Sequence, residues 1–268
     1  MPLMILCLLA IVQGLTEFIP VSSSAHLLLV HYWSGTEGDS LALDVAVHIG
    51  SVIAVLIYLR KEVLQVLRGL VQLLTGNRAT TEAQLAQNIV LVTIPTLLAG
   101  AVLSISGLID HLRNPTVIGV TMITFGLWLW WADQKSPSER DMKDFNIRDV
   151  LRLGLWQAVA LIPGTSRSGV TMTMARQLKF RRTEAARLSM LMSIPVTLAS
   201  GGYLGIKIAK DGMPAGMWGD IFLAAALSFA AAYVALILMM RFLRTTTFTP
   251  YVIYRLVLGM VLLAITLT

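Results

Sequence analysis

Long apolar runs separated by short clusters of charge constrain this chain more than any other feature. A helix needs about 20 mostly apolar residues to cross the hydrocarbon layer of a bilayer. Hydrophobic residues make up 56% of the chain and charged residues only 13%, so most of the chain needs a solvent other than water. We expect full transmembrane helices at 41–59, 88–105, 115–131, 188–206, 221–240 and 252–267.

Two polar stretches interrupt the apolar sequence, QGLTEFIPVSSSAH at 13–26 and LIPGTSRSGVT at 161–171. Their Ile-Pro pairs correspond, and Ser22-Ser23-Ser24 then corresponds to Thr165-Ser166-Arg167 without a gap. Non-helical backbone at membrane depth is tolerated only where protein or a wet cavity covers it. Each stretch is therefore predicted to be the turn of a re-entrant helix pair, and the two turns are predicted to build one shared site.

The same order of elements recurs in both halves of the chain, one re-entrant pair followed by three full spans. Three crossings invert the second half relative to the first. We therefore predict an all-α integral membrane protein with an inverted-topology repeat, in which six transmembrane helices accompany two re-entrant pairs that meet near the bilayer midplane. The first repeat covers 1–132, a cytoplasmic linker covers 133–150 and the second repeat covers 151–268, together forming one structural domain.

Basic residues are distributed unequally between the two sides of this topology. One set of loops carries most of the Lys and Arg residues, and the other receives only Arg113, Lys207 and Lys210. The positive-inside rule places the basic loops in the cytoplasm, so both termini and the first re-entrant pair face the periplasm. This topology accounts for the net charge of +6, and no nucleic-acid partner is predicted. Cys7 is the only cysteine, which excludes an intrachain disulfide.

The first polar stretch combines an acid, three serines and a histidine. An ionised Glu17 is costly in apolar surroundings unless it is paired or binds a metal, and a carboxylate suits Mg²⁺ or Ca²⁺. Gln13 lies on the same helix face and is a further candidate ligand. Ser23 beside His26 provides the elements of an activated nucleophile. Hydroxyls before a helix are more often caps, but the combination with Glu17 and His26 favours function.

Arg167 lies in the second polar stretch among hydroxyls and glycines. Backbone N–H groups at a helix start, hydroxyls and a guanidinium together form an anion pocket, which indicates phosphate or carboxylate. The alternatives are a snorkelling arginine or a structural pair with Glu17. Arg167 is central in its apolar hairpin, which makes snorkelling the weaker explanation.

Four other polar residues are expected near membrane depth. Asp44 and His48 lie four apart on the first full span and are predicted to border the site or to act as a gate. Gln157 and Arg255 are predicted to be structural partners rather than catalysts.

The first stretch resembles the (E/Q)GxxExxPxSSxxH signature of the undecaprenyl-diphosphate phosphatase family of the BacA or UppP type, and the second resembles its PGxSRSxxT signature. The segment EAARLSMLMSIP at 184–195 also fits, so the resemblance covers essentially the whole chain. It implies a bacterial inner-membrane enzyme that removes the terminal phosphate of undecaprenyl diphosphate and so regenerates a lipid carrier for the cell wall. It also implies bacitracin resistance.

The resemblance also implies roles for individual residues. Glu17 would hold the divalent metal or assist proton transfer, and Gln13 is neutral where the family also allows glutamate. Ser23 would be the nucleophile with His26 as its general base or acid, and direct attack by His26 is the competing assignment. Arg167 would bind the diphosphate and offset charge in the transition state. The other residues expected to bind the diphosphate are Ser22, Ser24, Gly164, Thr165, Ser166, Ser168 and Thr171.

The expected partners are the polyprenyl diphosphate and membrane lipid, and a homodimer is left open. The alternative function is a secondary transporter or lipid flippase with an anion site at the two turns, because inverted repeats with broken helices are typical of transporters. Glu17 would then couple transport to protons. Ser23 with His26 discriminates between the two functions, since anion transport needs a binding arginine but no nucleophile and base.

Overall fold

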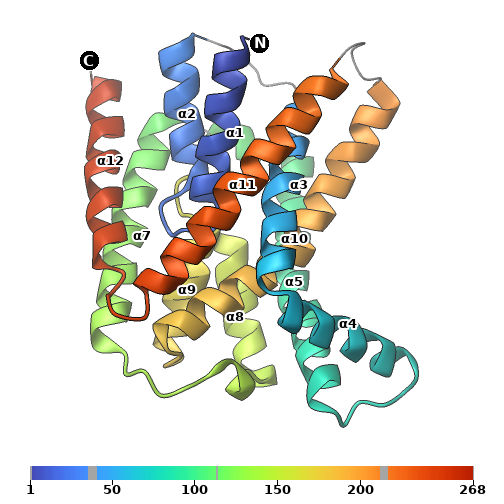
Figure 1. Ribbon diagram of the computed structural model, residues 1–268. Coiled ribbons are helices and arrows are strands. Elements are labelled where there is room, and N and C mark those ends of the chain that lie inside the picture. Colours follow the sequence, from blue (N-terminus) through green and yellow to red (C-terminus); the bar gives the residue numbers. More distant parts are fainter. Residues whose placement is uncertain (1, 36–40, 113, 212–216, 268) are drawn as a thin grey trace.

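A computed structural model describes residues 2–35, 41–112, 114–211 and 217–267, and all regular elements within these ranges are helical (Figure 1). Arg113 lies outside the described residues, as does the side chain of Lys207. The elements are α1 Leu3–Glu17, α2 Ser23–Ser34, α3 Leu41–Tyr58, α4 Arg60–Leu74, α5 Thr81–Ser106, α6 Leu108–Leu112, α7 Pro115–Lys135, η1 Met142–Asp144, α8 Ile147–Val159, α9 Arg167–Gln177, α10 Arg182–Asp211, α11 Trp218–Phe242 and α12 Thr249–Leu267.

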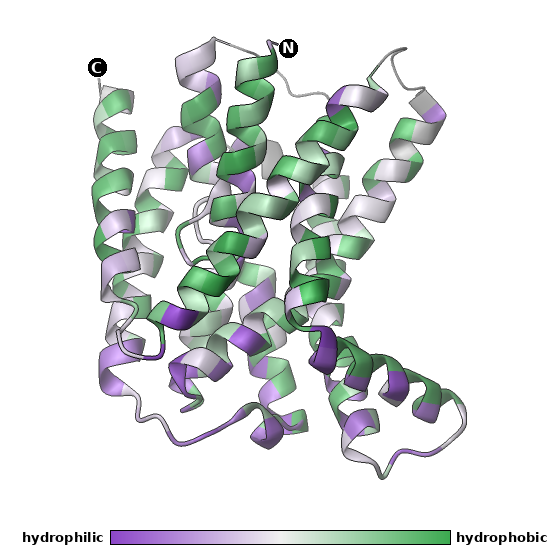
Figure 2. Cartoon of the chain, in the orientation of Figure 1, coloured by the Kyte–Doolittle hydropathy of each residue, from purple (hydrophilic) through white to green (hydrophobic). Residues whose placement is uncertain are grey.

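Five helices, α5, α7, α10, α11 and α12, are long and apolar enough to cross a membrane. The sixth predicted span forms α3, which together with α4 makes a pair bent by 90°. Apolar residues cover one side of α4 and charged residues the other, as expected for an amphipathic stretch (Figure 2). The chain is therefore an all-α membrane protein with five long apolar helices and one bent pair.

Helix boundaries follow local capping chemistry. The prediction that α5 begins at 88 was wrong, because the Thr80 hydroxyl accepts a hydrogen bond from the Ala83 N–H (3.1 Å) and starts the helix at Thr81. Asn114 caps α7 in the same way through the Val117 N–H (2.9 Å). Asn146 caps α8 through the Arg148 N–H (3.0 Å), and the helix begins at Ile147.

Helices from the two halves of the chain pack against each other throughout. α11 lies along α1 and α3, α12 lies along α7, and α5 lies along α8. The largest cluster of buried apolar side chains joins residues of both halves, among them Val55, Leu129, Leu188 and Met239. The pair α1–α2 enters from the end of the molecule that carries the termini and the pair α8–α9 from the opposite end, so that the turns of the two pairs meet near the middle (Figure 1).

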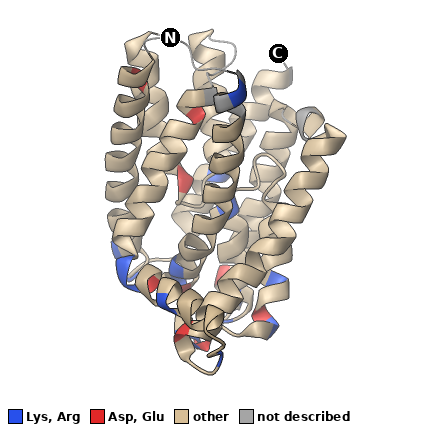
Figure 3. Cartoon of the chain, turned by 90° about the vertical axis from the view of Figure 1, so that its right-hand side faces the viewer, with Lys and Arg blue, Asp and Glu red and all other residues tan. Residues whose placement is uncertain are grey.

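Charged residues gather at one end of the molecule, and both termini lie at the other (Figures 1 and 3). The linker between α7 and α8 is ordered at the charged end. The Arg140 guanidinium binds the Asp149 carboxylate (2.5 Å) and lies over the ring of Phe180 (4.3 Å). Nearby, a fully buried Arg176 pairs with Asp133 (2.9 Å). These contacts fasten the linker to the helices instead of leaving a flexible boundary.

Candidate active site

The two polar turns end in the same local geometry. Ser22 (φ 73°, ψ 97°) precedes α2 and Ser166 (φ 67°, ψ 113°) precedes α9, and each is in a conformation that L-residues rarely adopt. The hydroxyl oxygens of Ser22 and Ser24 are 3.0 Å apart, and those of Ser166 and Ser168 are 3.1 Å apart. Ser23 is therefore equivalent to Arg167, and the ungapped correspondence was wrong by one residue because the second turn is longer.

Capping differs between the two turns. The Ser166 hydroxyl accepts a hydrogen bond from the Gly169 N–H (3.2 Å), so Ser166 is a helix cap. The Ser22 hydroxyl makes no capping bond. The proposal that the first three serines only cap a helix therefore does not account for them.

The second turn is shaped to fit against α7. Gly164 has φ +88°, and a Cβ at this position would lie 2.1 Å from Thr121 Oγ1 and 2.6 Å from Ile118 O. Thr121 Oγ1 donates a hydrogen bond to Pro163 O (2.7 Å). Only glycine fits here, on both steric and conformational grounds.

The two turns contact each other directly. Ser168 Oγ donates to Ile19 O (2.9 Å), and the Gly164 N–H donates to Ser24 Oγ (3.3 Å). Segments far apart in sequence thus meet, as the paired polar stretches predicted.

Arg255 of α12 holds together the place where the two turns meet, which we call the junction. Its fully buried guanidinium forms no ion pair with a carboxylate among the described residues and instead donates to backbone carbonyls. The acceptors are Pro20 O (3.4 Å), Gly164 O (3.2 Å), Thr165 O (3.0 Å) and Met122 O (3.2 Å). Arg255 therefore has the structural role that we expected.

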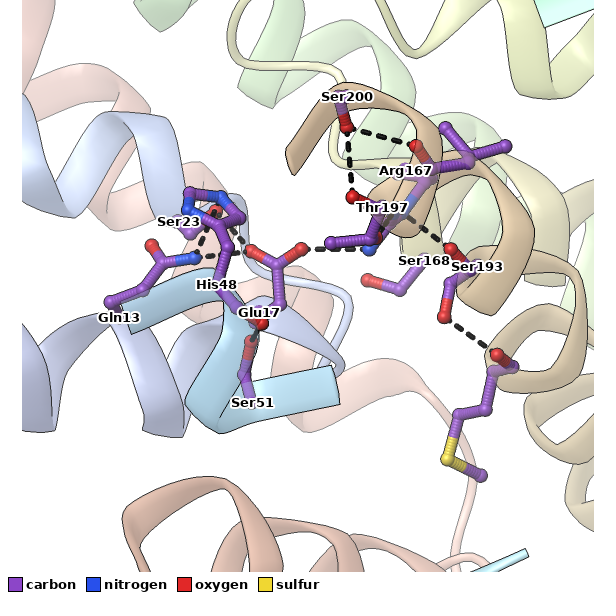
Figure 4. A network of polar contacts seen from close by, with 12 residues as sticks. Gln13, Glu17, Ser23, His48, Ser51, Arg167, Ser168, Ser193, Thr197 and Ser200 are labelled. Carbon is purple, nitrogen blue, oxygen red and sulfur yellow. Dashed lines mark hydrogen bonds and ion pairs between the residues drawn. The ribbon is translucent and has the colours of Figure 1, made fainter. Parts of the chain in front are cut away.

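Glu17 lies at the centre of a polar network at the junction (Figure 4). Its Oε1 atom accepts from Arg167 Nη2 (2.7 Å), and its Oε2 atom accepts from Gln13 Nε2 (2.6 Å) and Ser23 Oγ (3.1 Å). The side chains of Arg167 and Glu17 are only 18% and 9% exposed. A carboxylate, a hydroxyl and a guanidinium from two remote stretches thus converge inside the helix bundle.

The network extends to α3 through His48. His48 Nδ1 lies 2.7 Å from Asp44 O, which only accepts, so Nδ1 carries the proton. Nε2 then accepts from Gln13 Nε2 (3.2 Å). The amide hydrogens of Gln13 are therefore shared between His48 and Glu17. His48, with Asp44 one helical turn before it, therefore lies beside the Glu17 network.

Thr197 of α10 is a member of the network that sequence reasoning missed. Its hydroxyl accepts a hydrogen bond from Arg167 Nη1 (2.6 Å) and so helps to orient the guanidinium toward Glu17 (Figure 4). The signal for Thr197 in the sequence is weak, because a threonine in an apolar helix usually bonds to a carbonyl of its own helix.

His26 points away from this network. Its Nδ1–H donates to Ser22 O (2.7 Å), and its Nε2 accepts from the hydroxyl of Tyr254 (2.6 Å), whose ring stacks on it. The expected pairing of Ser23 with His26 is not formed, since Ser23 donates to Glu17 instead. His26 lines a separate, largely apolar cavity of about 1000 Å³.

A cavity of about 510 Å³ lies at the junction and includes Glu17, Ser23 and Arg167 in its lining beside apolar side chains. Of the residues expected to bind a diphosphate, Ser22, Ser24, Gly164 and Ser166 also line it. The other three do not, because their hydroxyls serve internal bonds: Thr165 to Ile162 O (2.7 Å), Ser168 to Ile19 O (2.9 Å), and Thr171 to Arg167 O (2.8 Å).

The donor set fits a divalent cation that shares its ligands with a substrate. No group of three or more His, Cys, Asp or Glu side chains in the described part of the chain could hold a metal by itself. The cavity offers the Glu17 carboxylate and a buried Gln13 Oε1 atom that has no hydrogen-bond partner. Mg²⁺ typically binds one or two protein oxygens together with water and substrate phosphates, so this sparse set is compatible with it.

Known proteins match this chain over nearly its whole length. The model of the family described as bacitracin resistance protein BacA matches residues 6–261. The chain is 52% identical over 267 residues to the undecaprenyl-diphosphatase of Ruegeria pomeroyi, covering 99% of both proteins. It is 49% identical to the undecaprenyl-diphosphatase of Jannaschia sp., again covering 99% of both. It is 44% identical over 251 residues to that of Hahella chejuensis, covering 94% of this chain and 93% of the relative.

Proposed function

The chain belongs to the BacA family of bacitracin resistance proteins, and from this premise we propose that it is an undecaprenyl-diphosphatase. The observation that carries the proposal is the meeting of Glu17, Ser23 and Arg167 in one cavity inside an apolar bundle. A substrate with a charged diphosphate and a long apolar tail suits such a cavity, because the tail remains in lipid while the head group is held in polar surroundings.

Ser23 is the proposed nucleophile. Its hydroxyl already donates to Glu17 Oε2 (3.1 Å), so the carboxylate can take the proton as Ser23 Oγ attacks the terminal phosphorus. The bond from this phosphorus to the bridging oxygen breaks, and the polyprenyl monophosphate leaves with the bonding electrons. Arg167 offsets the negative charge on the transferring group. A phosphoserine remains on the chain.

Water completes the cycle. It attacks the phosphoserine phosphorus, the bond to Ser23 Oγ breaks, and Glu17 returns its proton to that oxygen. The phosphate leaves as H₂PO₄⁻, which keeps both hydrogens of the water. Glu17 therefore acts first as base and then as acid, and no second titrating side chain is needed.

The position of His26 argues against its being the nucleophile. One ring nitrogen carries a proton that is donated to Ser22 O, and the lone pair of the other accepts from Tyr254. Its role is to fix the backbone at Ser22, whose left-handed conformation directs Ser23 toward Glu17.

A divalent cation, Mg²⁺ or Ca²⁺, is the proposed cofactor, with Glu17 and the Oε1 atom of Gln13 as its protein ligands. When bound, the cation would neutralise charge on the diphosphate. Gln13→Glu adds a second carboxylate, so the cation concentration needed for half-maximal thermal stabilisation of the purified protein should fall. An unchanged requirement would remove Gln13 from the ligand set.

We propose an inverted-repeat topology in the inner membrane with both termini and the cavity on the periplasmic side. The shared geometry of the two turns and the gathering of charge at the end opposite the termini support it (Figure 3). With Cys7 replaced, a cysteine introduced near His26 should react with an impermeant thiol reagent in whole cells. If the cysteine reacted only after permeabilisation, the cavity would face the cytoplasm and the proposed orientation would be wrong.

The activity itself is tested with the purified chain in detergent, given undecaprenyl diphosphate and Mg²⁺ or Ca²⁺. Phosphate release is expected, with loss of release in Glu17→Ala and Arg167→Ala. Acid quenching in mid-turnover should trap phosphate on Ser23. Activity that survives both substitutions would end the proposal. Phosphate trapped on His26 would show that His26, and not Ser23, is the nucleophile.

A further inference from the structure

All the buried side-chain polar atoms that lack a hydrogen-bond partner, among the residues that the structure describes, belong to three residues of one cavity. They are Gln13 Oε1, Thr96 Oγ1 and both polar atoms of Gln157. Gln157 is fully buried and Thr96 is 3% exposed. Unpaired buried polar groups destabilise a fold, and their clustering at a cavity indicates groups kept for a ligand.

Thr96 and Gln157 come from two helices that pack closely at this level. A Cβ on Gly154 of α8 would lie 2.9 Å from Val92 O and 3.0 Å from Pro95 Cγ of α5. Gln157 follows Gly154 by about one helical turn, and Thr96 is adjacent to Pro95. The two side chains therefore form one polar wall of the cavity, which we call the Gln157–Thr96 wall.

A neighbouring threonine shows that the lack of pairing is confined to residues that line the cavity. Thr93, on the same helix, donates its hydroxyl to Ile89 O (2.8 Å) and does not line the cavity. Threonine hydroxyls in apolar helices usually find such a carbonyl. The Thr96 hydroxyl does not, although the helix offers it the same type of acceptor.

We propose that the Gln157–Thr96 wall binds the lipid-linked phosphate of the substrate diphosphate, which makes it a subsite for the leaving group. This inference rests on the proposed phosphatase function. The reacting terminal phosphate must lie at Ser23 and Arg167, so the second phosphate needs other donors. The Gln157 amide and Thr96 hydroxyl supply N–H and O–H donors, and phosphate oxygens only accept.

The surroundings of the wall suit the substrate tail. Leu161, Ile162 and Val196 line the same cavity and are only partly buried, so the cavity offers apolar side chains as well as the polar wall. Donors on the lipid-linked phosphate would also stabilise the charge that develops there when the bond from the bridging oxygen to the terminal phosphorus breaks. The wall therefore contributes both to binding and to the rate of the chemical step.

Two nearly isosteric substitutions test the proposal, Gln157→Leu and Thr96→Val, with Thr93→Val as the matched control. Phosphate release, competitive inhibition by polyprenyl monophosphate and inhibition by inorganic phosphate are measured on the purified chain. Each wall variant should lose about 10- to 100-fold in kcat/KM and in affinity for the monophosphate, as expected for a hydrogen bond to a charged group. Inhibition by inorganic phosphate, which is expected to bind at Arg167, should be unchanged in the wall variants. Thr93→Val should match the unchanged chain in kcat/KM and in inhibition by both the monophosphate and inorganic phosphate.

Thermal unfolding separates this role from a structural one. Replacing an unpaired buried polar group by an apolar one is neutral or stabilising, so the wall variants should unfold at the same temperature or higher while binding more weakly. Unchanged monophosphate affinity, or an equal loss in phosphate inhibition, would overturn the subsite. A wild-type chain without phosphatase activity would instead overturn the function on which the subsite rests.

Discussion

The ion pair between Glu17 and Arg167 predicts a specific pattern in a double-mutant cycle. Its closest oxygen and nitrogen atoms are 2.7 Å apart, and both side chains are largely withdrawn from solvent. Removing one member of such a pair leaves an uncompensated buried charge, which costs about 3–5 kcal/mol. We therefore expect Glu17→Gln and Arg167→Met each to lower the free energy of unfolding by about that amount.

The double variant Glu17→Gln/Arg167→Met should recover much of this loss, because it leaves no unpaired charge. A recovery of about 2–4 kcal/mol relative to the sum of the single changes is expected. The assay is equilibrium unfolding in mixed detergent micelles. The double variant should recover no activity, and Glu17→Gln alone should lower the rate about 10²- to 10⁴-fold through loss of the general base.

The exposed pair of Lys179 and Glu139 is the matched control. Its atoms are 3.2 Å apart, but its side chains are 53% and 57% exposed, so its coupling should be below about 1 kcal/mol. If the Glu17–Arg167 coupling were no larger than this, the two charges would not form a buried pair. Recovery of activity in the double variant would refute the catalytic roles.

Three further predictions follow from the turns. Gly164→Ala adds a Cβ 2.1 Å from Thr121 Oγ1 at φ +88°, so we expect a loss of about 3 kcal/mol or more in unfolding free energy, and an unchanged unfolding midpoint would contradict the packing described. Arg255→Met removes the donor to the buried carbonyls at the junction and should destabilise the chain by about 3–5 kcal/mol; a loss below about 1 kcal/mol would contradict its role. Ser23→Ala should abolish phosphate release with a stability change below about 1 kcal/mol, whereas His26→Ala should keep a measurable rate; the reverse order of rates would restore His26 as nucleophile.

The sequence predicted the helices and the meeting of the turns because both follow from burial. Apolar runs must lie in lipid, and an acid such as Glu17 needs a partner or a metal there. The pair with Arg167 was only an alternative to an anion-binding arginine, and the structure shows that this pair forms. The direction of His26 could not be predicted in the same way. It accompanies a left-handed conformation of Ser22, which a serine rarely adopts and which the sequence does not indicate.

The hydrogen-bond partners of the hydroxyl groups in the membrane-spanning helices could not be predicted from the sequence either. Thr93, Thr96 and Thr197 are the same residue type in similar apolar sequence, yet one bonds its own helix, one has no partner and one binds Arg167. Only the packing of neighbouring helices separates these three outcomes. For the same reason, sequence reasoning placed Thr165, Ser168 and Thr171 around the ligand, whereas their hydroxyls serve the turns themselves.

The Arg255 junction bears on how the protein can move. Carriers with broken helices expose their site alternately to the two sides of the membrane by rocking one half against the other. Here a single guanidinium holds carbonyls of both turns and of α7, so such a motion would have to break several bonds inside a dry interior. The bonds of Arg255 to both turns therefore oppose any rocking motion that would draw the two turns apart.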